Sequence, residues 1–139
     1  MTIQLNVTTR NARLDTIEST NGTSCSLEIR TGAQPANCAT TDSGTTLATI
    51  NLPSNWMANA SSGSKAIAGT WQDSSADTTG TAAHFRIYNS QVVLDETTCF
   101  MQGSVTITGG GGDMTVDNTS FATGQSFTIT TFTLTDANP

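Results

Sequence analysis

The chain has 139 residues, of which 35% are hydrophobic and only 12% are charged, and its formal net charge at pH 7 is −6. This length predicts one domain with a core of its own, and the composition argues against a disordered chain. Neutralising phosphates takes clustered Lys and Arg, so five basic residues against eleven acidic ones disfavour binding to nucleic acid or to an anionic membrane.

Three cysteines and the N-terminal sequence bear on where the chain is made. The sequence begins without the charged start and long apolar segment of a signal peptide, and no apolar run has transmembrane length. Cys25, Cys38 and Cys99 form an odd set without the CxxC spacing of a metal or redox site. We therefore expect cytoplasmic synthesis, free thiols and no metal or other cofactor; a Cys25–Cys38 bridge across the intervening loop is the alternative.

The start of the chain predicts a short strand followed by a short helix. Apolar and polar residues alternate over 3–7, as in a strand with one buried face. Thr8 or Thr9 then supplies the N-cap of a helix that runs through Glu18, and Asn21-Gly22 ends it.

The remaining residues, 23–139, predict one β domain. Segments rich in β-branched residues alternate there with turns that contain Gly, Pro or Asn. The expected strands cover 26–31, 45–52, 65–71, 82–88, 92–94, 98–108, 113–118 and 127–135, and four glycines at 109–112 form a turn. This pattern predicts an all-β fold, an antiparallel β-sandwich of jelly-roll type, preceded by a separate segment (residues 1–22) with the short helix.

The last expected strand contains a break in its alternation. Phe127 and Ile129 share one parity, Phe132 and Leu134 share the other, and Thr130-Thr131 lies between them. Because a slip of one residue sends every later side chain to the opposite face, we expect a β-bulge at the two threonines. A strand that crosses from one sheet to another is the alternative.

No group of residues has the spacing of a catalytic or metal site. His84, the one histidine, is predicted on the solvated face of its strand, and no cysteine beside it suggests a Cys–His nucleophile. Asp113 and Asp117 could share a strand face, as a glycosidase pair or a calcium site requires, but surface charge explains them more simply. We therefore expect that the protein is not an enzyme.

Five short phrases resemble small structural proteins of tailed bacteriophages, and within that group the capsid decoration, or cement, proteins. They are Leu52-Pro-Ser-Asn-Trp-Met57, Gly69-Thr-Trp-Gln-Asp73, His84-Phe-Arg-Ile-Tyr88, Met114-Thr-Val-Asp-Asn118 and Ser126-Phe-Thr-Ile-Thr130. The resemblance implies a compact, often jelly-roll-like β-sandwich on the outer surface of the virion head. It implies binding across neighbouring major capsid subunits, with self-association as a dimer or trimer on the lattice, and it carries no catalytic residue over to this chain.

A docking arm is the specific hypothesis within that resemblance, and we assign it to residues 1–22. Two of the five basic residues lie there, and its two apolar helix positions lack an obvious partner inside the β domain. The expected capsid-contacting residues are Arg10, Arg13, Leu14 and Ile17.

Two rival interpretations stay open at this stage. A tail or head fibre component has the same Thr- and Ser-rich character, although fibres usually contain repetitive segments that this chain lacks. A carbohydrate-binding module would use Trp56, Trp71 and Tyr88 as a stacking platform, and it requires Trp56 or Tyr88 to be exposed. Trp71 shares parity with Ile67 and is expected in the core.

Overall fold

The structure, a computed structural model, describes residues 3–137. Within that range the chain is mostly β, with one helix, α1 (Val7–Asn21), near its start. The strands are β1 (Ser26–Arg30), β2 (Thr46–Asn51), β3 (Ser64–Ala66), β4 (Gln72–Asp73), β5 (Gly80–Thr81), β6 (His84–Tyr88), β7 (Cys99–Ile107), β8 (Met114–Val116), β9 (Ser120–Phe121) and β10 (Phe127–Thr135). The predicted strand 127–135 is confirmed with the bounds of β10.

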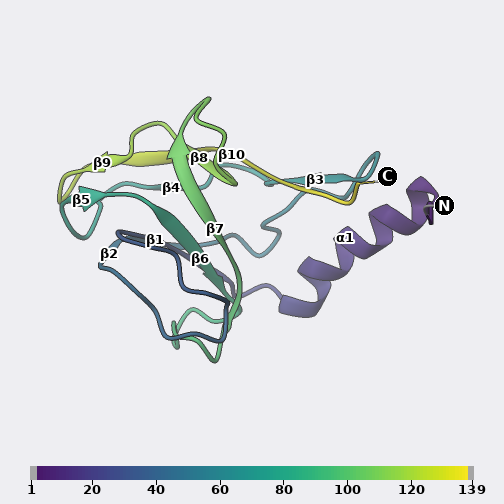
Figure 1. Cartoon of the computed structure of the whole chain (residues 1–139), viewed down its shortest axis with the longest axis horizontal. Helices are drawn as coiled ribbons and strands as arrows, with labels where there is room; N and C mark the ends of the chain where they lie inside the picture. Colours follow the sequence, from purple (N-terminus) through teal and green to yellow (C-terminus); the bar gives the residue numbers. More distant parts are fainter. Residues whose placement is uncertain (1–2, 138–139) are drawn as a thin grey trace.

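Most of the strands belong to one sheet with the order β2-β1-β6-β7-β8-β10-β3, in which β4 also pairs with β10. β5 and β9 form a separate two-stranded sheet. In Figure 1 the large sheet folds over on itself, so that β1, β2 and β6 lie below β8, β10 and β4, and the long strand β7 crosses between the two levels. The core fills the space between these levels, where Phe85 of β6 meets Phe132 of β10 edge to face at 5.4 Å.

The prediction of an antiparallel sheet is wrong for one pair, because β7 and β8 run parallel. Their connection is short, since Val105 in β7 already lies opposite Met114 in β8. The predicted glycine turn at 109–112 makes this possible: Gly109 and Gly111 have positive φ angles of 83° and 79°. A Cβ on Gly110 or Gly112 would lie 2.8 Å from side-chain atoms of Thr106, so only glycine lets the chain fold back this closely.

The β-bulge in β10 is confirmed. Ile129 pairs with Val116 and Thr131 with Thr115, which leaves Thr130 as the extra residue. Both threonines are exposed, and the inward positions change from Phe127 and Ile129 before the bulge to Phe132 after it. The Thr130 hydroxyl lies 2.6 Å from the hydroxyl of Thr115 and 2.8 Å from that of Thr108, so the bulge is tied to its neighbours.

Two of the predicted strands are absent, each because side chains bind the backbone locally. The strand expected over 3–7 is wrong: Asn6 accepts a hydrogen bond from the Thr9 amide at 2.8 Å and starts α1 earlier than expected. Gly22 ends the helix, as predicted. The strand expected over 92–94 is a loop, in which the Ser90 hydroxyl accepts hydrogen bonds from the amides of Val92 and Val93.

α1 lies beside β3 and the end of β10, and together they extend from one side of the β body (Figure 1). We call residues 3–21, which include α1, the segment 57–66 and residues 133–137, which include the end of β10, the projection. The described chain begins and ends in it. Among the described residues, no helix is both long enough and apolar enough to cross a membrane.

Deleting Thr130 tests whether the bulge consists of a single extra residue in β10. The deletion restores regular alternation from Ile129 to Phe132, so it should cost only the lost hydroxyl contacts, about 1–2 kcal/mol of unfolding free energy. Deleting Thr128 instead places Phe127 or Ile129 on the wrong face and should cost about 3 kcal/mol or more. Urea unfolding of both variants decides the matter; equal losses would contradict the assigned register.

Candidate functional site

Four of the five basic side chains make ion pairs within the chain, and the fifth, Arg10, binds a neutral carbonyl oxygen. Each of the five basic side chains is held by another part of the chain: Arg13 by Asp136, Arg30 by Glu28 and Asp42, Lys65 by Asp15 and Glu18, Arg86 by Asp42, and Arg10 by the Ser62 carbonyl. Six carboxylates lie outside these pairs, and all charged residues fall within 3–137: Asp73, Asp77, Asp95, Glu96, Asp113 and Asp117. Among the described residues, the charge outside the ion pairs is therefore mostly acidic: six carboxylates against the one positive charge of Arg10.

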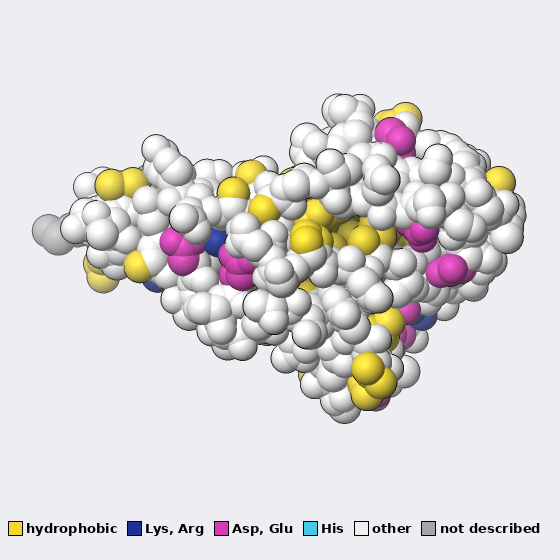
Figure 2. All heavy atoms as spheres, turned by 180° about the vertical axis from the view of Figure 1, so that it is seen from behind, with side chains coloured by type: hydrophobic (Ala, Val, Ile, Leu, Met, Phe, Trp, Pro, Cys, Tyr) yellow, Lys and Arg dark blue, Asp and Glu magenta, His cyan; other side chains and the backbone are white. Residues whose placement is uncertain are grey.

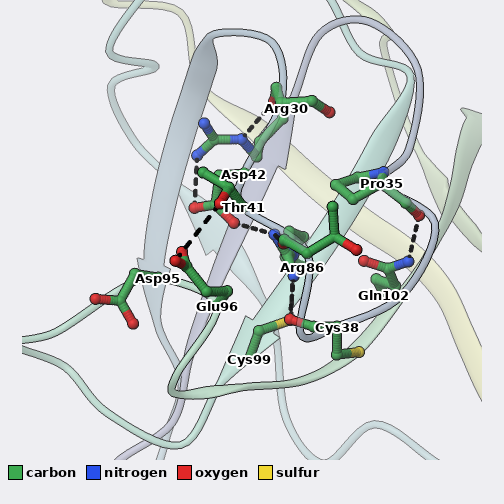
Figure 3. Close-up of polar contacts among 12 residues, drawn as sticks. Arg30, Pro35, Cys38, Thr41, Asp42, Arg86, Asp95, Glu96, Cys99 and Gln102 are labelled. Atoms are coloured by element: carbon green, nitrogen blue, oxygen red, sulfur yellow. Dashed lines mark hydrogen bonds and ion pairs between the residues drawn. The ribbon is translucent and has the colours of Figure 1, made fainter.

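A charged network covers the face of the sheet that points away from the core. The register places Glu28 opposite Arg86 and Arg30 opposite His84, so two rows of polar side chains cross β1 and β6. The loop 31–45, which joins β1 to β2, passes over these rows (Figure 3). A sheet face that the alternation predicts as solvated is thus closed by a loop.

Arg86 is the centre of this network, which we call the Arg86 cluster (Glu28, Arg30, Asp42, Arg86 and Tyr88). The Arg86 side chain is completely buried and makes an ion pair with Asp42 of the loop. Its guanidinium also donates to the carbonyl oxygens of Thr40 at 2.9 Å and Cys38 at 2.6 Å (Figure 3). One strand residue therefore fixes three successive parts of the loop.

The other members of the cluster complete its hydrogen bonding. The Tyr88 hydroxyl lies 2.9 Å from Glu28 and 3.0 Å from Asp42, and its burial beside these two carboxylates raises the pKa of the phenol. Arg30 donates to the carbonyl of Ser43 at 2.9 Å and to the hydroxyl of Thr46 at 2.6 Å. Because each buried charge has a partner, the cluster stabilises one position of the loop instead of leaving uncompensated charge inside the protein.

The prediction that His84 is a solvated surface residue is wrong, since only 1% of it is exposed. Its Nδ1 lies 3.0 Å from the Gly32 carbonyl, so this nitrogen carries the proton and donates to the loop. Burial, together with the nearby charges of Arg30 and Arg86, lowers the pKa of the imidazole, against the opposing effects of Gly32 and Asp42. His84 is thus a neutral donor that helps to hold the loop 31–45.

The carbohydrate-binding alternative required an exposed Trp56 or Tyr88, but Trp56, Trp71 and Tyr88 are all fully buried. Trp71 lies in the core, as expected, and its ring is 5.7 Å from that of Phe132. Trp56 packs 6.3 Å from Trp71 and donates to the Gly22 carbonyl at 3.1 Å. The tryptophans therefore join the core of the body to the end of α1.

The two aspartates considered as a pair have different partners. Asp113 accepts hydrogen bonds from the amide and hydroxyl of Ser104 at 2.8 and 2.7 Å, which lowers the pKa of its carboxyl. Asp117 accepts one from the amide of Thr128 at 3.1 Å. Across residues 3–137, no three His, Cys, Asp or Glu side chains are grouped closely enough to hold a metal ion.

In the projection, α1 is held mainly by polar contacts. Three acceptors on one stripe of the helix bind three backbone amides of the facing segment: Glu18 binds Met57 at 3.2 Å, Asp15 binds Ala60 at 2.9 Å and Asn11 binds Gly63 at 2.8 Å. The spacings match because the helix stripe repeats every three to four residues. This explains how a helix with a thin apolar stripe stays in place.

Lys65 is buried beneath these contacts, with 1% of its side chain exposed. Its ammonium lies 2.8 Å from Asp15, 3.1 Å from Glu18 and 3.0 Å from the Ala58 carbonyl, so its three donors are all used. Burial opposes the charge, but the two carboxylates outweigh it and raise the pKa of Lys65. Figure 2 shows acidic side chains on the projection with a basic side chain between them.

The four residues predicted to contact the capsid differ in how accessible their side chains are. Leu14 is buried at 5% exposure and Ile17 packs against the core, so the premise that they lack a partner in the chain is wrong. Arg10 is turned inward to Ser62, whereas the Arg13 side chain is 62% exposed. A groove of about 370 Å³ nevertheless brings Arg13, Leu14 and Ile17 together with the end of β10 and residues 136–137. Three of the four predicted residues thus line one recess.

Sequence reasoning missed the Arg86 cluster entirely. Its signal was present: Glu28, Arg30, His84 and Arg86 occupy alternate positions of two neighbouring strands, which is unusual for a chain with so few charges. No protein-family model matches this chain, and no curated protein or solved structure is significantly similar to it. What the protein does is therefore inferred from its own residues and geometry.

Replacing Arg86 by Met should cost about 3 kcal/mol or more of unfolding free energy, because Asp42 and the carbonyls of Thr40 and Cys38 lose a buried partner. Arg13→Ala is the matched control: it also removes an Arg–Asp pair, but an exposed one, and should cost less than about 1 kcal/mol. Both are measured by chemical denaturation at pH 7. Similar losses in the two variants would mean that the Arg86 cluster does not hold the loop.

Proposed function

We propose that this protein is a structural virion component that decorates and stabilises the outer surface of a tailed-phage capsid. It binds across neighbouring major capsid subunits and acts by adhesion, without catalysing a reaction. The resemblance of five sequence phrases to decoration proteins suggests this role, and within it the finer jelly-roll assignment stays a prediction. The observation that carries the proposal is the projection. Polar contacts hold its inner side in place, and its outer side is exposed for contact with a partner.

The projection suits a docking element because its inner side is already fixed. The backbone contacts of Asn11, Asp15 and Glu18 hold α1 in place before any partner binds, so little conformational entropy is lost on docking. Its outer side presents apolar and basic groups that contribute little to the fold: Ile3 is 84% exposed, Val7 49%, and the Arg13 side chain 62%. On the face of the molecule drawn in Figure 2, hydrophobic atoms gather in a hollow where the projection meets the body.

The acidic surface of the rest of the molecule fits a part made in many copies. Six unpaired carboxylates keep free copies apart and soluble in the cytoplasm of the host, and they disfavour contact with nucleic acid and anionic membranes. Modest contacts repeated over a lattice, with self-association as a dimer or trimer, make loss of the whole layer improbable. The groups that could have served catalysis, such as His84, are engaged in holding the loop 31–45.

The carbohydrate-binding alternative loses its basis, because the aromatic side chains it needs are buried. The fibre alternative makes a different prediction about size. A fibre component forms an elongated trimer, whereas a decoration protein is a compact monomer, dimer or trimer. Sedimentation velocity separates the two before any partner is added.

Co-sedimentation with expanded heads of the major capsid protein encoded in the same genome tests the proposal. The wild-type protein should bind, and a Val7→Ser, Arg13→Glu double variant should bind at least about tenfold more weakly, because it alters the outer side of α1 without touching its clamp. Val92→Ser is the control, since Val92 is 91% exposed on a loop outside the projection.

The outcomes test separately whether the protein decorates heads and which of its surfaces binds them. If the wild-type protein fails to bind heads, decoration is ruled out. If it binds and the double variant binds equally well, the protein decorates heads through another surface, and the assignment to the projection is wrong.

A further inference from the structure

Two of the three cysteines, Cys38 and Cys99, lie next to Arg86. Cys38 belongs to the loop 31–45, and Cys99 is the first residue of β7, which is next to β6 in the sheet. Tyr88 pairs with Cys99 across the two strands, so Cys99 stands at the edge of the Arg86 cluster. The proposed function gives these thiols no role.

We propose that Cys38 and Cys99 are a modification site, a thiol pair that a small disulfide such as oxidised glutathione converts into an intramolecular disulfide. The bond fastens the loop 31–45 covalently to β7. This inference rests on the geometry of the Arg86 cluster and is independent of capsid binding.

Arg86 brings the two residues together. Its Nε donates to the Cys99 sulfur at 3.1 Å, and its guanidinium donates to the Cys38 carbonyl at 2.6 Å. Figure 3 shows both cysteines below this guanidinium, one from the loop and one from the strand. The Cys38 side chain is near enough to affect the Cys99 sulfur: burial raises the pKa of the Cys99 thiol to about 11, Arg86 opposes this rise, and Cys38 adds to it.

The third cysteine differs from Cys38 and Cys99 in its deeper burial and in its place in the fold. Cys25 is fully buried, and its sulfur lies 3.7 Å from the Asn21 carbonyl and 3.6 Å from the Gly22 carbonyl at the end of α1. Burial, with the charge of Glu18, raises the pKa of its thiol to about 11. Cys25 is therefore an internal control for selective oxidation.

The reaction follows ordinary thiol–disulfide exchange. The Cys38 thiolate, on the loop, attacks one sulfur of oxidised glutathione, forms a mixed disulfide and releases one glutathione thiolate. The Cys99 sulfur loses its proton to solvent, while the Arg86 N–H stabilises the resulting thiolate. It then attacks the Cys38 sulfur, which forms the protein disulfide and releases the second glutathione. Two protein thiols are oxidised, and one glutathione disulfide is reduced to two thiols.

The disulfide closes a long stretch of chain, from Cys38 to Cys99, that includes the strands from β2 to β6. Restricting such a stretch in the unfolded state stabilises the folded protein. The loop that Arg86 holds by hydrogen bonds and charge is then held by a covalent bond as well, so its position no longer depends on the Arg86 cluster alone.

The test is to incubate the folded protein with oxidised glutathione at pH 8 and to map its thiols by peptide mass spectrometry without reduction. We expect a linked pair of peptides containing Cys38 and Cys99, a mass lower by two hydrogen atoms, and a rise in Tm of about 5 °C or more. Cys25→Ser should give the same linkage and the same rise, whereas Cys38→Ser should give neither.

Three results would overturn the proposal. One is a stable glutathione adduct on Cys38 without the internal bond, another is a linkage that involves Cys25, and the third is an unmodified protein after complete exposure to the oxidant. Cys38→Ser keeps the backbone carbonyl that Arg86 binds, so this variant should fold and its Tm in reducing buffer serves as the baseline.

Discussion

The burial of Arg86 is the constraint on which the rest of the molecule depends. A guanidinium on the outer face of β6 has no place in a dry interior unless its charge and its donors all find partners. The loop 31–45 supplies them through Asp42 and the carbonyls of Cys38 and Thr40. Meeting that requirement closes one face of the sheet, withdraws His84 and Tyr88 from solvent, and brings two thiols to the same place.

The placement of the charged side chains also distinguishes the projection from the body. Three of the five basic side chains hold a segment that local hydrophobic packing alone would leave loose: Arg86 and Arg30 hold the loop, and Lys65 lies under α1. The charges left unpaired on the surface of the body are carboxylates. On the projection, the outer side of α1 presents Arg13, whose side chain is 62% exposed. This division is the physical basis for proposing that the projection docks on a capsid while the acidic body faces solvent.

Sequence reasoning could predict features that follow from short-range pattern. The alternation of Phe127, Ile129, Phe132 and Leu134 is sufficient to place the bulge, and Gly22 is sufficient to end the helix. The parallel pairing of β7 with β8 could not be foreseen, because it depends on how closely Gly110 and Gly112 pack on Thr106. The burial of His84 was missed for a similar reason: strand parity says which face a side chain takes, but not whether a loop from elsewhere in the chain covers that face.

A cryo-EM reconstruction of heads saturated with the protein tests the central claim most directly, since it shows which surface meets the capsid. The account predicts that α1 and the groove lined by Arg13 and Ile17 contact the boundary between major capsid subunits, while the loop 31–45 faces away from the shell. Density in which the loop or the β5–β9 end of the body makes the contact, with the projection free in solvent, would contradict it.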